Sequence, residues 1–298
     1  MEDNELYYNL LLKERIRKIQ TVIRDYYEEY FYIAFSGGKD STVLSALIDL
    51  AIPDNKIPRV YADTGIELNL IRNFVYDLQK QDDRIIIIKP SKNIKQTLET
   101  YGYPFKSKVF SKYVERFRRL GKVKSIEVFI GEHEEKQWSS KFSCPDKLKY
   151  LFSYEYTPTF PISMECCIKM KENPMLQWQK INNKKYPIIG VMREEGGGRI
   201  NANCMNFTKT DLKSFQPLVK LTKDWENWFI EKYNIQICSI YYPPYSFERT
   251  GCKGCPFNPN VQTELNVLQQ FFPEERKQCE YIWKPVYEEY RRINYRLK

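Results

Sequence analysis

The sequence predicts an α/β fold built on a doubly wound, mainly parallel five-stranded sheet with helical additions. Short apolar runs at 31–35, 57–65 and 85–89 alternate with segments of helical periodicity, an order typical of parallel sheets with right-handed crossovers. Two further apolar runs, at 186–191 and 215–221, are expected to be the fourth and fifth strands. A chain of 298 residues is long enough to bury a substantial core around such a sheet.

Helical patterns fill the sequence around these strands. Residues 5–30 carry apolar side chains near helical spacing, and 68–78 and 224–233 are expected to be further helices. The stretch from 262 is expected to be helical, with a second helix starting at Pro273. We therefore expect three parts: an N-terminal helical segment at 1–30, a central domain at 31–260 with an insertion at 106–162, and a C-terminal helical segment at 261–298.

The composition limits which kinds of protein this chain can be. The acidic start of the chain lacks the apolar region of a secretory signal, and no apolar run approaches the roughly 20 residues of a membrane span. We expect a cytoplasmic protein, without a membrane partner, whose eight cysteines are reduced or metal-bound. The single histidine, His133, excludes a His-rich zinc site and makes a His-based triad very improbable. A net charge of +9 favours acidic partners.

A glycine turn follows the first predicted strand and leads into a helix. Two adjacent glycines let the backbone approach a ligand closely, and the first N–H groups of a helix attract an anion. Ser41 is expected to cap this helix. The turn does not have the spacing of a Walker A loop, and a purely structural turn is the alternative. The predicted anion site consists of Ser36, Gly37, Gly38, Lys39, Asp40, Ser41 and Thr42.

Two other predicted strands end in polar residues. Ligands of parallel sheets bind at the carboxyl ends of strands, where Asp63 and Gly65 follow the second strand. Asp63 is suited to a metal, a ribose or an amino group, and a helix cap is the alternative. The fourth strand leads to Arg193 and Arg199, whose guanidinium groups suit anionic oxygens; a flexible exposed loop is the alternative there.

A basic segment and four cysteines complete the candidate residues. Residues 106–124 carry eight Lys or Arg against one acid, with aromatic side chains at helical spacing. This pattern indicates either a solvated helix face or a surface for nucleic acid or nucleotide. Cys252 and Cys255 fit a zinc half-site, a redox pair or half of a cluster site. Cys166 and Cys167 are the natural second half, and they reach one site best from a helix start.

Several of these motifs together resemble a known family. The Ser-Gly-Gly-Lys-Asp-Ser-Thr loop resembles the PP-loop of the nucleotide α-hydrolase superfamily, and Asp63-Thr64-Gly65 with Glu67 resembles the second motif of phosphoadenosine phosphosulfate (PAPS) reductase-like proteins. Cys-Cys-x-x-x-Lys-x-x-Pro at 166–174, followed by Cys-x-x-Cys, is similar to the iron–sulfur arrangement of bacterial adenylylsulfate reductases. The resemblance covers about residues 30 to 260.

This resemblance implies a fold, ligands and roles. It implies an adenine nucleotide α-hydrolase sheet, ATP or an adenylyl nucleotide on the loop and at Asp63 and Gly65, and Mg²⁺ on the phosphates. It implies a 4Fe–4S cluster on the four cysteines, where spacing alone leaves zinc open. The implied catalytic residues are Lys39, Asp63, Arg193 and Arg199.

The C-terminal tail departs from the family. Assimilatory reductases end in Glu-Cys-Gly-x-His, whereas this tail holds Gln278-Cys279-Glu280, and Cys279 is expected to be a buried structural residue. Three functions remain open. The first is ATP-dependent adenylation followed by thiolation of an acceptor, with tRNA or DNA as candidate acceptors. The second is a sulfonucleotide reductase that releases sulfite with a thioredoxin-like partner. The third is a non-catalytic nucleotide sensor or nucleic-acid-binding module.

Overall fold

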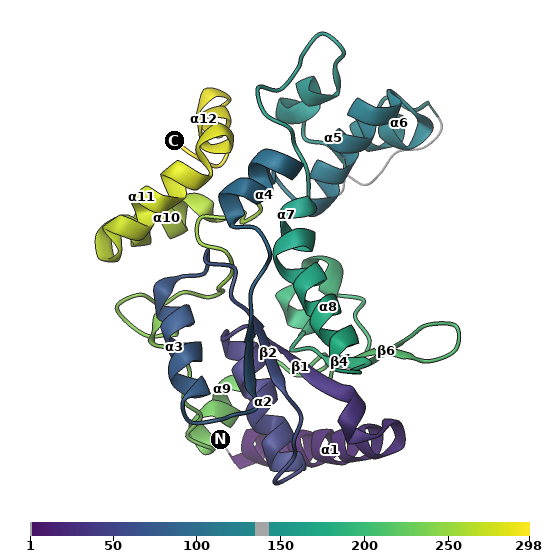
Figure 1. Cartoon of the computed structure of the whole chain (residues 1–298), viewed down its shortest axis with the longest axis vertical. Helices are drawn as coiled ribbons and strands as arrows, with labels where there is room; N and C mark the ends of the chain where they lie inside the picture. The colour runs from purple at the N-terminus through teal and green to yellow at the C-terminus, as the bar shows by residue number, and fades with distance from the viewer. Residues whose placement is uncertain (1, 135–142) are drawn as a thin grey trace. The chain divides into compact units, whose positions relative to one another are not determined.

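The computed structural model describes residues 2–134 and 143–298 (Figure 1). The chain packs as two compact units. The first comprises Met1–Asp63, Glu67–Lys89 and Asn173–Thr250, and the second comprises Thr64–Ile66, Pro90–Glu172 and Gly251–Lys298. This division groups residues by packing and does not test the predicted boundaries at 30 and 260, which stay a prediction.

A single sheet organises the first unit. Its strand order is β3-β2-β1-β4-β6-β5, and all neighbours are parallel except β5 and β6. The doubly wound, mainly parallel α/β class is therefore confirmed, although the described sheet has six strands and not five. The strands are β1 Phe31–Phe35, β2 Arg59–Ala62, β3 Ile85–Ile88, β4 Tyr186–Ile188, β5 Met205–Phe207 and β6 Leu212–Phe215.

The predicted strands differ from the observed ones mainly at the sheet edges. The expected fifth strand at 215–221 is wrong in extent, because its strand residues are 212–215 and the rest forms turns. The unexpected β5 is three residues long and half-exposed, so no apolar run marks it. In the structure β3 is an edge strand in which only Ile85 is buried.

Helices cover both faces of this sheet. They are α1 Glu2–Tyr26, α2 Lys39–Ala51, α3 Asn69–Gln79, α8 Asn173–Ile181 and α9 Lys223–Lys232. The α2 helix packs against β1, α1 and α9, whereas α8 packs against β2 and β3. Successive side chains of β1 point to opposite faces of the sheet. Ile33 belongs to the main core on one face. The Tyr32 hydroxyl, on the other face, donates to Gln179 Oε1 of α8 at 3.2 Å.

The second unit is helical and rich in aromatic contacts. Its α-helices are α4 Ile94–Tyr101, α5 Lys108–Leu120, α6 Lys124–Ile130, α7 Glu165–Cys167, α10 Val261–Phe271, α11 Pro273–Ile282 and α12 Lys284–Arg292. A π-helical turn at Ile168–Glu172 follows α7. Phe105 packs on Phe110 and Tyr290, and Phe110 packs on Phe129 and Phe152.

The basic segment at 106–124 is one helix, α5, followed by a turn at Gly121 and the start of α6. Gly121 has φ of 72°, a conformation that glycine adopts readily, and it ends α5. Within the described part of the chain, no helix has both the length and the apolar character needed to cross a membrane.

Candidate functional site

The glycine turn lies at the carboxyl end of β1, as the sequence predicts. Gly37 has φ of +70°, and α2 begins at Lys39 with Gly38 as its N-cap. The expected capping by Ser41 is therefore wrong, because the helix starts two residues earlier. The Ser41 hydroxyl donates instead to the Gly38 carbonyl at 2.9 Å, and the Thr42 hydroxyl donates to the same carbonyl at 3.0 Å.

Gly37 is required by its surroundings as well as by its backbone angle. A Cβ at this position would lie well under 3.0 Å from Val75 Cγ2 of α3. Any other residue would displace α3 or the turn, and it would also adopt a strained φ. The first glycine therefore allows the close packing between the turn and α3.

The backbone amides of the turn already have partners within the first unit. The Gly38 N–H donates to Ser36 Oγ at 3.3 Å, and the Lys39 N–H donates to the Tyr241 hydroxyl at 3.1 Å. That hydroxyl lies 2.6 Å from Thr250 Oγ1. The Tyr241 hydroxyl thus occupies the position from which an anion at the start of α2 would accept the Lys39 N–H. The sequence reasoning missed Tyr241 and Thr250, because no motif links them to the turn.

The Lys39 side chain also has a partner that the sequence did not indicate. Its Nζ lies 2.9 Å from Oε2 of Glu226 on α9, and Glu226 is only 1% exposed. Burial and the nearby charge of Asp40 raise the pKa of Glu226 to about 7, although Lys39 opposes the shift. Glu226 is a single acid in a helix of ordinary pattern, so only the fold shows that it faces the loop.

Asp63 is held at the end of β2 by two residues of α3. Its carboxylate accepts from Arg72 Nε at 3.1 and 3.2 Å and from the Tyr76 hydroxyl at 2.7 Å. Asp63 is buried, and the N-cap of α3 is Leu68, so the helix-cap alternative is wrong. Gly65, with φ of +74°, belongs to the second unit.

The two predicted arginines lie in 3₁₀ turns after β4. Arg193 Nε donates to the Ala202 carbonyl at 2.8 Å, and Arg199 pairs with Glu195. Arg249, which the sequence did not indicate, shares that carboxylate at 3.2 Å. Glu195 is mostly buried and pairs with the guanidinium groups of Arg199 and Arg249, both of which remain partly exposed.

The four predicted metal-ligating cysteines all belong to the second unit. Cys166 and Cys167 lie in the short helix α7, which confirms the predicted helix start. The hydrogen bond between their thiols raises the pKa of Cys166 and lowers that of Cys167, which is also near Lys108 and Lys171. Cys252 and Cys255 raise the pKa of Cys166 further by their charge, so the four sulfurs act on one another.

The positions of the four cysteines suit a cluster better than a single metal ion. Among the described residues, no group of three or more His, Cys, Asp or Glu lies in the geometry of a single bound ion. A 4Fe–4S cluster takes one thiolate on each iron, so its cysteines are spaced more widely than the ligands of one tetrahedral zinc. Four thiols in one electrostatic neighbourhood fit the donor set of such a cluster.

The C-terminal helices hold the turn that carries Cys252 and Cys255. Trp283 Nε1 donates to the Lys253 carbonyl at 3.0 Å, Tyr287 donates to the Gly254 carbonyl, and Tyr290 donates to the Pro256 carbonyl at 3.0 Å. Side chains of the C-terminal helices thus satisfy the buried carbonyls of Lys253, Gly254 and Pro256, which holds the backbone on both sides of Cys255.

The basic helix α5 presents its charges unevenly. Lys112, Arg116 and Arg119 are exposed and follow helical spacing along one face. Arg118 instead donates to the carbonyls of Leu151 at 3.0 Å and Tyr156 at 2.6 Å, so it supports the fold.

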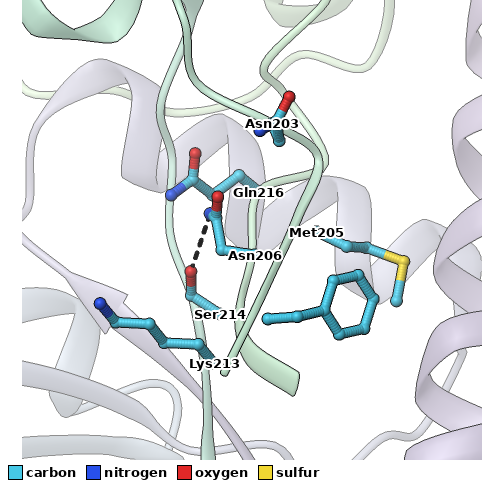
Figure 2. Close-up of a pocket in the computed structure, with 7 residues that line it drawn as sticks. Asn203, Met205, Asn206, Lys213, Ser214 and Gln216 are labelled. Atoms are coloured by element: carbon cyan, nitrogen blue, oxygen red, sulfur yellow. Dashed lines mark hydrogen bonds between the residues drawn. The ribbon is translucent and has the colours of Figure 1, made fainter. Parts of the chain in front are cut away.

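A pocket of 570 Å³ lies elsewhere in the first unit, on the β5–β6 hairpin (Figure 2). It is lined by Asn203, Met205, Asn206, Phe207, Lys213, Ser214 and Gln216. A hydrogen bond of 3.1 Å joins Asn206 Nδ2 to Ser214 Oγ across the two strands (Figure 2). None of the predicted site residues lines this pocket.

Comparison with solved structures gives distant similarities. PAPS reductase from Candida auris, in a phosphate complex, has 10% identity and a TM-score of 0.43 over 75% of this chain and 81% of that chain. FMN adenylyltransferase from Candida glabrata has 14% identity and a TM-score of 0.45 over 83% and 69%. The U34-tRNA thiolase NcsA from Methanococcus maripaludis, with its 4Fe–4S cluster, has 13% identity and a TM-score of 0.38 over 96% and 80%.

Comparison of the sequence with curated proteins finds no match. The comparison with protein families does find one, and it covers β1, the glycine turn, α2, Asp63 and α5. Residues 31–140 match the phosphoadenosine phosphosulfate reductase domain family, which confirms the resemblance predicted from the sequence over this segment.

Proposed function

We propose that this protein is a PP-loop enzyme that binds ATP or an adenylyl nucleotide and uses it in sulfur transfer to an anionic acceptor. The observation that carries the proposal is the glycine turn at 36–42. It places the N-terminus of α2, with Lys39, at the carboxyl end of β1 in the segment that matches the family.

The proposed reaction splits ATP between its α- and β-phosphates: an acceptor oxygen takes the adenylyl group as pyrophosphate leaves, and a sulfur donor then displaces AMP. The amides at the start of α2 and the Lys39 ammonium stabilise the charge that develops on the leaving pyrophosphate. We propose that Mg²⁺ binds to the ATP phosphates. Arg193 and Arg199 are proposed to contact the nucleotide phosphates, and Asp63, fixed by Arg72 and Tyr76, is proposed to orient the nucleotide.

A 4Fe–4S cluster is proposed on Cys166, Cys167, Cys252 and Cys255. When bound, such a cluster supplies iron that can hold or activate sulfur. The protein contributes a lowered pKa at Cys167, which favours the thiolate that a metal binds, and a braced turn for Cys252 and Cys255.

The reductase alternative needs an attacking thiol, and Cys279 is poorly suited to this role. Its side chain is 0% exposed in α11, and burial raises its pKa to about 12. A Cβ on Gly254 would lie 2.8 Å from the Cys279 sulfur, so this thiol packs directly behind the cysteine turn. These features indicate a structural cysteine.

The charge of the second unit favours a polyanionic acceptor. By sequence, this unit holds 24 Lys and Arg against 16 Asp and Glu, which is +8 of the net +9. The first unit, with the nucleotide loop, is almost neutral. A surface that attracts phosphates without sequence preference is expected from such a concentration of charge. We therefore propose a nucleic acid, tRNA or DNA, as the acceptor.

The first prediction tests the nucleotide loop. Lys39→Ala should weaken ATP binding by about 10- to 100-fold, the effect of losing one charged hydrogen bond of about 1.5–3 kcal/mol. Gly38→Val should also weaken it, because a Cβ there meets Tyr241, Ser36 and Thr250 at 3.1–3.2 Å. Gly198→Ala, in open space, is the matched control. Calorimetry measures affinity and pyrophosphate release measures turnover; binding unchanged in both loop variants would refute the site.

The second prediction concerns the cluster. Anaerobically purified protein should be brown, with a broad visible absorption band and about four iron and four sulfide per chain. Cys252→Ser should remove the band, whereas Cys238→Ser should retain it, because Cys238 is buried in the first unit. Colourless protein with one zinc per chain would instead indicate a structural zinc site.

The third prediction separates sulfur transfer from sulfite-releasing reduction. In native protein, Cys279 should resist alkylation at pH 8, because it is buried and its thiolate is scarce. Peptide mass spectrometry should find it labelled only after unfolding. Rapid native labelling of Cys279, together with sulfite release from adenylylsulfate or PAPS and thioredoxin, would make the reductase the better assignment.

The fourth prediction tests the acceptor surface. Reversing Lys112, Arg116 and Arg119 to Glu should weaken tRNA or DNA binding uniformly across sequences. The slope of log affinity against log salt should become shallower by about two to three, at about 0.7–0.9 per lost contact. Arg118 is left in place because it supports the fold.

Reversal of Lys13, Arg17 and Lys209 to Glu, all exposed in the first unit, gives a control with the same change of net charge. Equal losses in the two triple variants would show that only net charge matters. No binding of tRNA or DNA at low salt by the wild type would make a small-molecule acceptor the better proposal.

A further inference from the structure

The ion pair between Lys39 and Glu226 combines a proposed phosphate ligand with a deeply buried acid. The carboxylate is 1% exposed, and its Oε2 lies 2.9 Å from Lys39 Nζ. Among the described residues, neither carboxylate oxygen has a partner in hydrogen-bond geometry, so the charge of Lys39 is its main compensation. Lys39 itself is partly exposed and belongs to the first turn of α2.

We propose that Glu226 is a positioning residue that holds Lys39 at the loop and takes up a proton when a nucleotide phosphate binds there. The proposal rests on the nucleotide site proposed above and adds a second role for α9. Lys39 serves one anion at a time: the carboxylate in the free protein and the phosphate in the complex.

The exchange follows from the cost of a buried charge. Once Lys39 turns its charge to the phosphate, Glu226 remains in a site closed to water, next to the negative ligand. An uncompensated carboxylate in such a site is strongly disfavoured, and it becomes neutral by binding a proton. The neutral acid then stays buried at lower cost, and Lys39 is fully available to the phosphate.

The charged groups around Glu226 act on its pKa in opposite directions. Those that shift its titration are Lys39 and Asp40, both from α2, which packs against α9. Asp40 repels the ionised form and Lys39 stabilises it, while burial and Asp40 together raise the pKa of the free protein to about 7. Loss of the Lys39 contribution must raise this pKa further. Proton uptake should therefore be largest above pH 7, where Glu226 is ionised in the free protein and still protonated in the complex.

The test is calorimetry of ATP binding at pH 8 without magnesium, in Tris and in HEPES, whose ionisation enthalpies differ. At this pH the ATP phosphates are ionised and contribute few protons of their own. The wild type should take up close to one proton per ATP bound. Its affinity should fall by up to about tenfold per pH unit above pH 7.5, as linkage requires.

Glu226→Gln should abolish this uptake, make the affinity nearly independent of pH, and bind ATP up to about tenfold more tightly at pH 8. Glu231→Gln, an exposed acid on the same helix, should behave like the wild type. If Glu226→Gln fails to fold, the buffer and pH series on the wild type still decides. ATP binding with no proton uptake would overturn the proposal while the nucleotide site stands; absence of ATP binding would overturn both.

Discussion

The close approach of α3 to the glycine turn is the constraint on which the first unit depends. Gly37 takes a positive φ and leaves no room for a Cβ beside Val75. This contact lets the turn end β1 tightly, so that α2 starts at Lys39 with its amides toward the carboxyl edge of the sheet. The same helix α3 supplies Arg72 and Tyr76 to Asp63. One small residue therefore positions both the anion site and the neighbouring acid.

The parts that follow local rules could be predicted from the sequence. The strand before the turn, the glycine turn itself and the helix start at Cys166 and Cys167 were predicted correctly, and the first two are specified locally by an apolar run and by glycines. The contact partners of those residues could not be predicted from the sequence. Glu226, Tyr241 and Arg249 reach their contacts through packing between distant segments, and each stands in a stretch without a motif. The short strand β5 was not predicted for a related reason, since it forms by pairing with β6 and has no apolar run of its own.

The net charge is distributed unevenly between the two units. The unit with the loop is nearly neutral, and its cations near the predicted site have internal acids, as in Lys39 with Glu226 and Arg199 with Glu195. The second unit carries almost all of the net charge, and part of it lies on the open face of α5. Paired cations in an enclosed site select a ligand by exchange, whereas exposed cations attract any polyanion and are screened by salt.

The internal partners of the loop residues also affect how tightly the loop could bind a ligand. A phosphate bound to the loop as proposed would replace the Tyr241 hydroxyl at the Lys39 amide and the Glu226 carboxylate at the Lys39 ammonium. Each displaced group loses a hydrogen-bond or ion-pair partner. The net binding free energy is therefore the difference between the interactions made in the complex and those made in the free loop. A ligand with more negative charge than a carboxylate gains most from this exchange, and a neutral one gains nothing. The internal partners thus stabilise the free loop, and under the proposed function they would favour multiply charged phosphates.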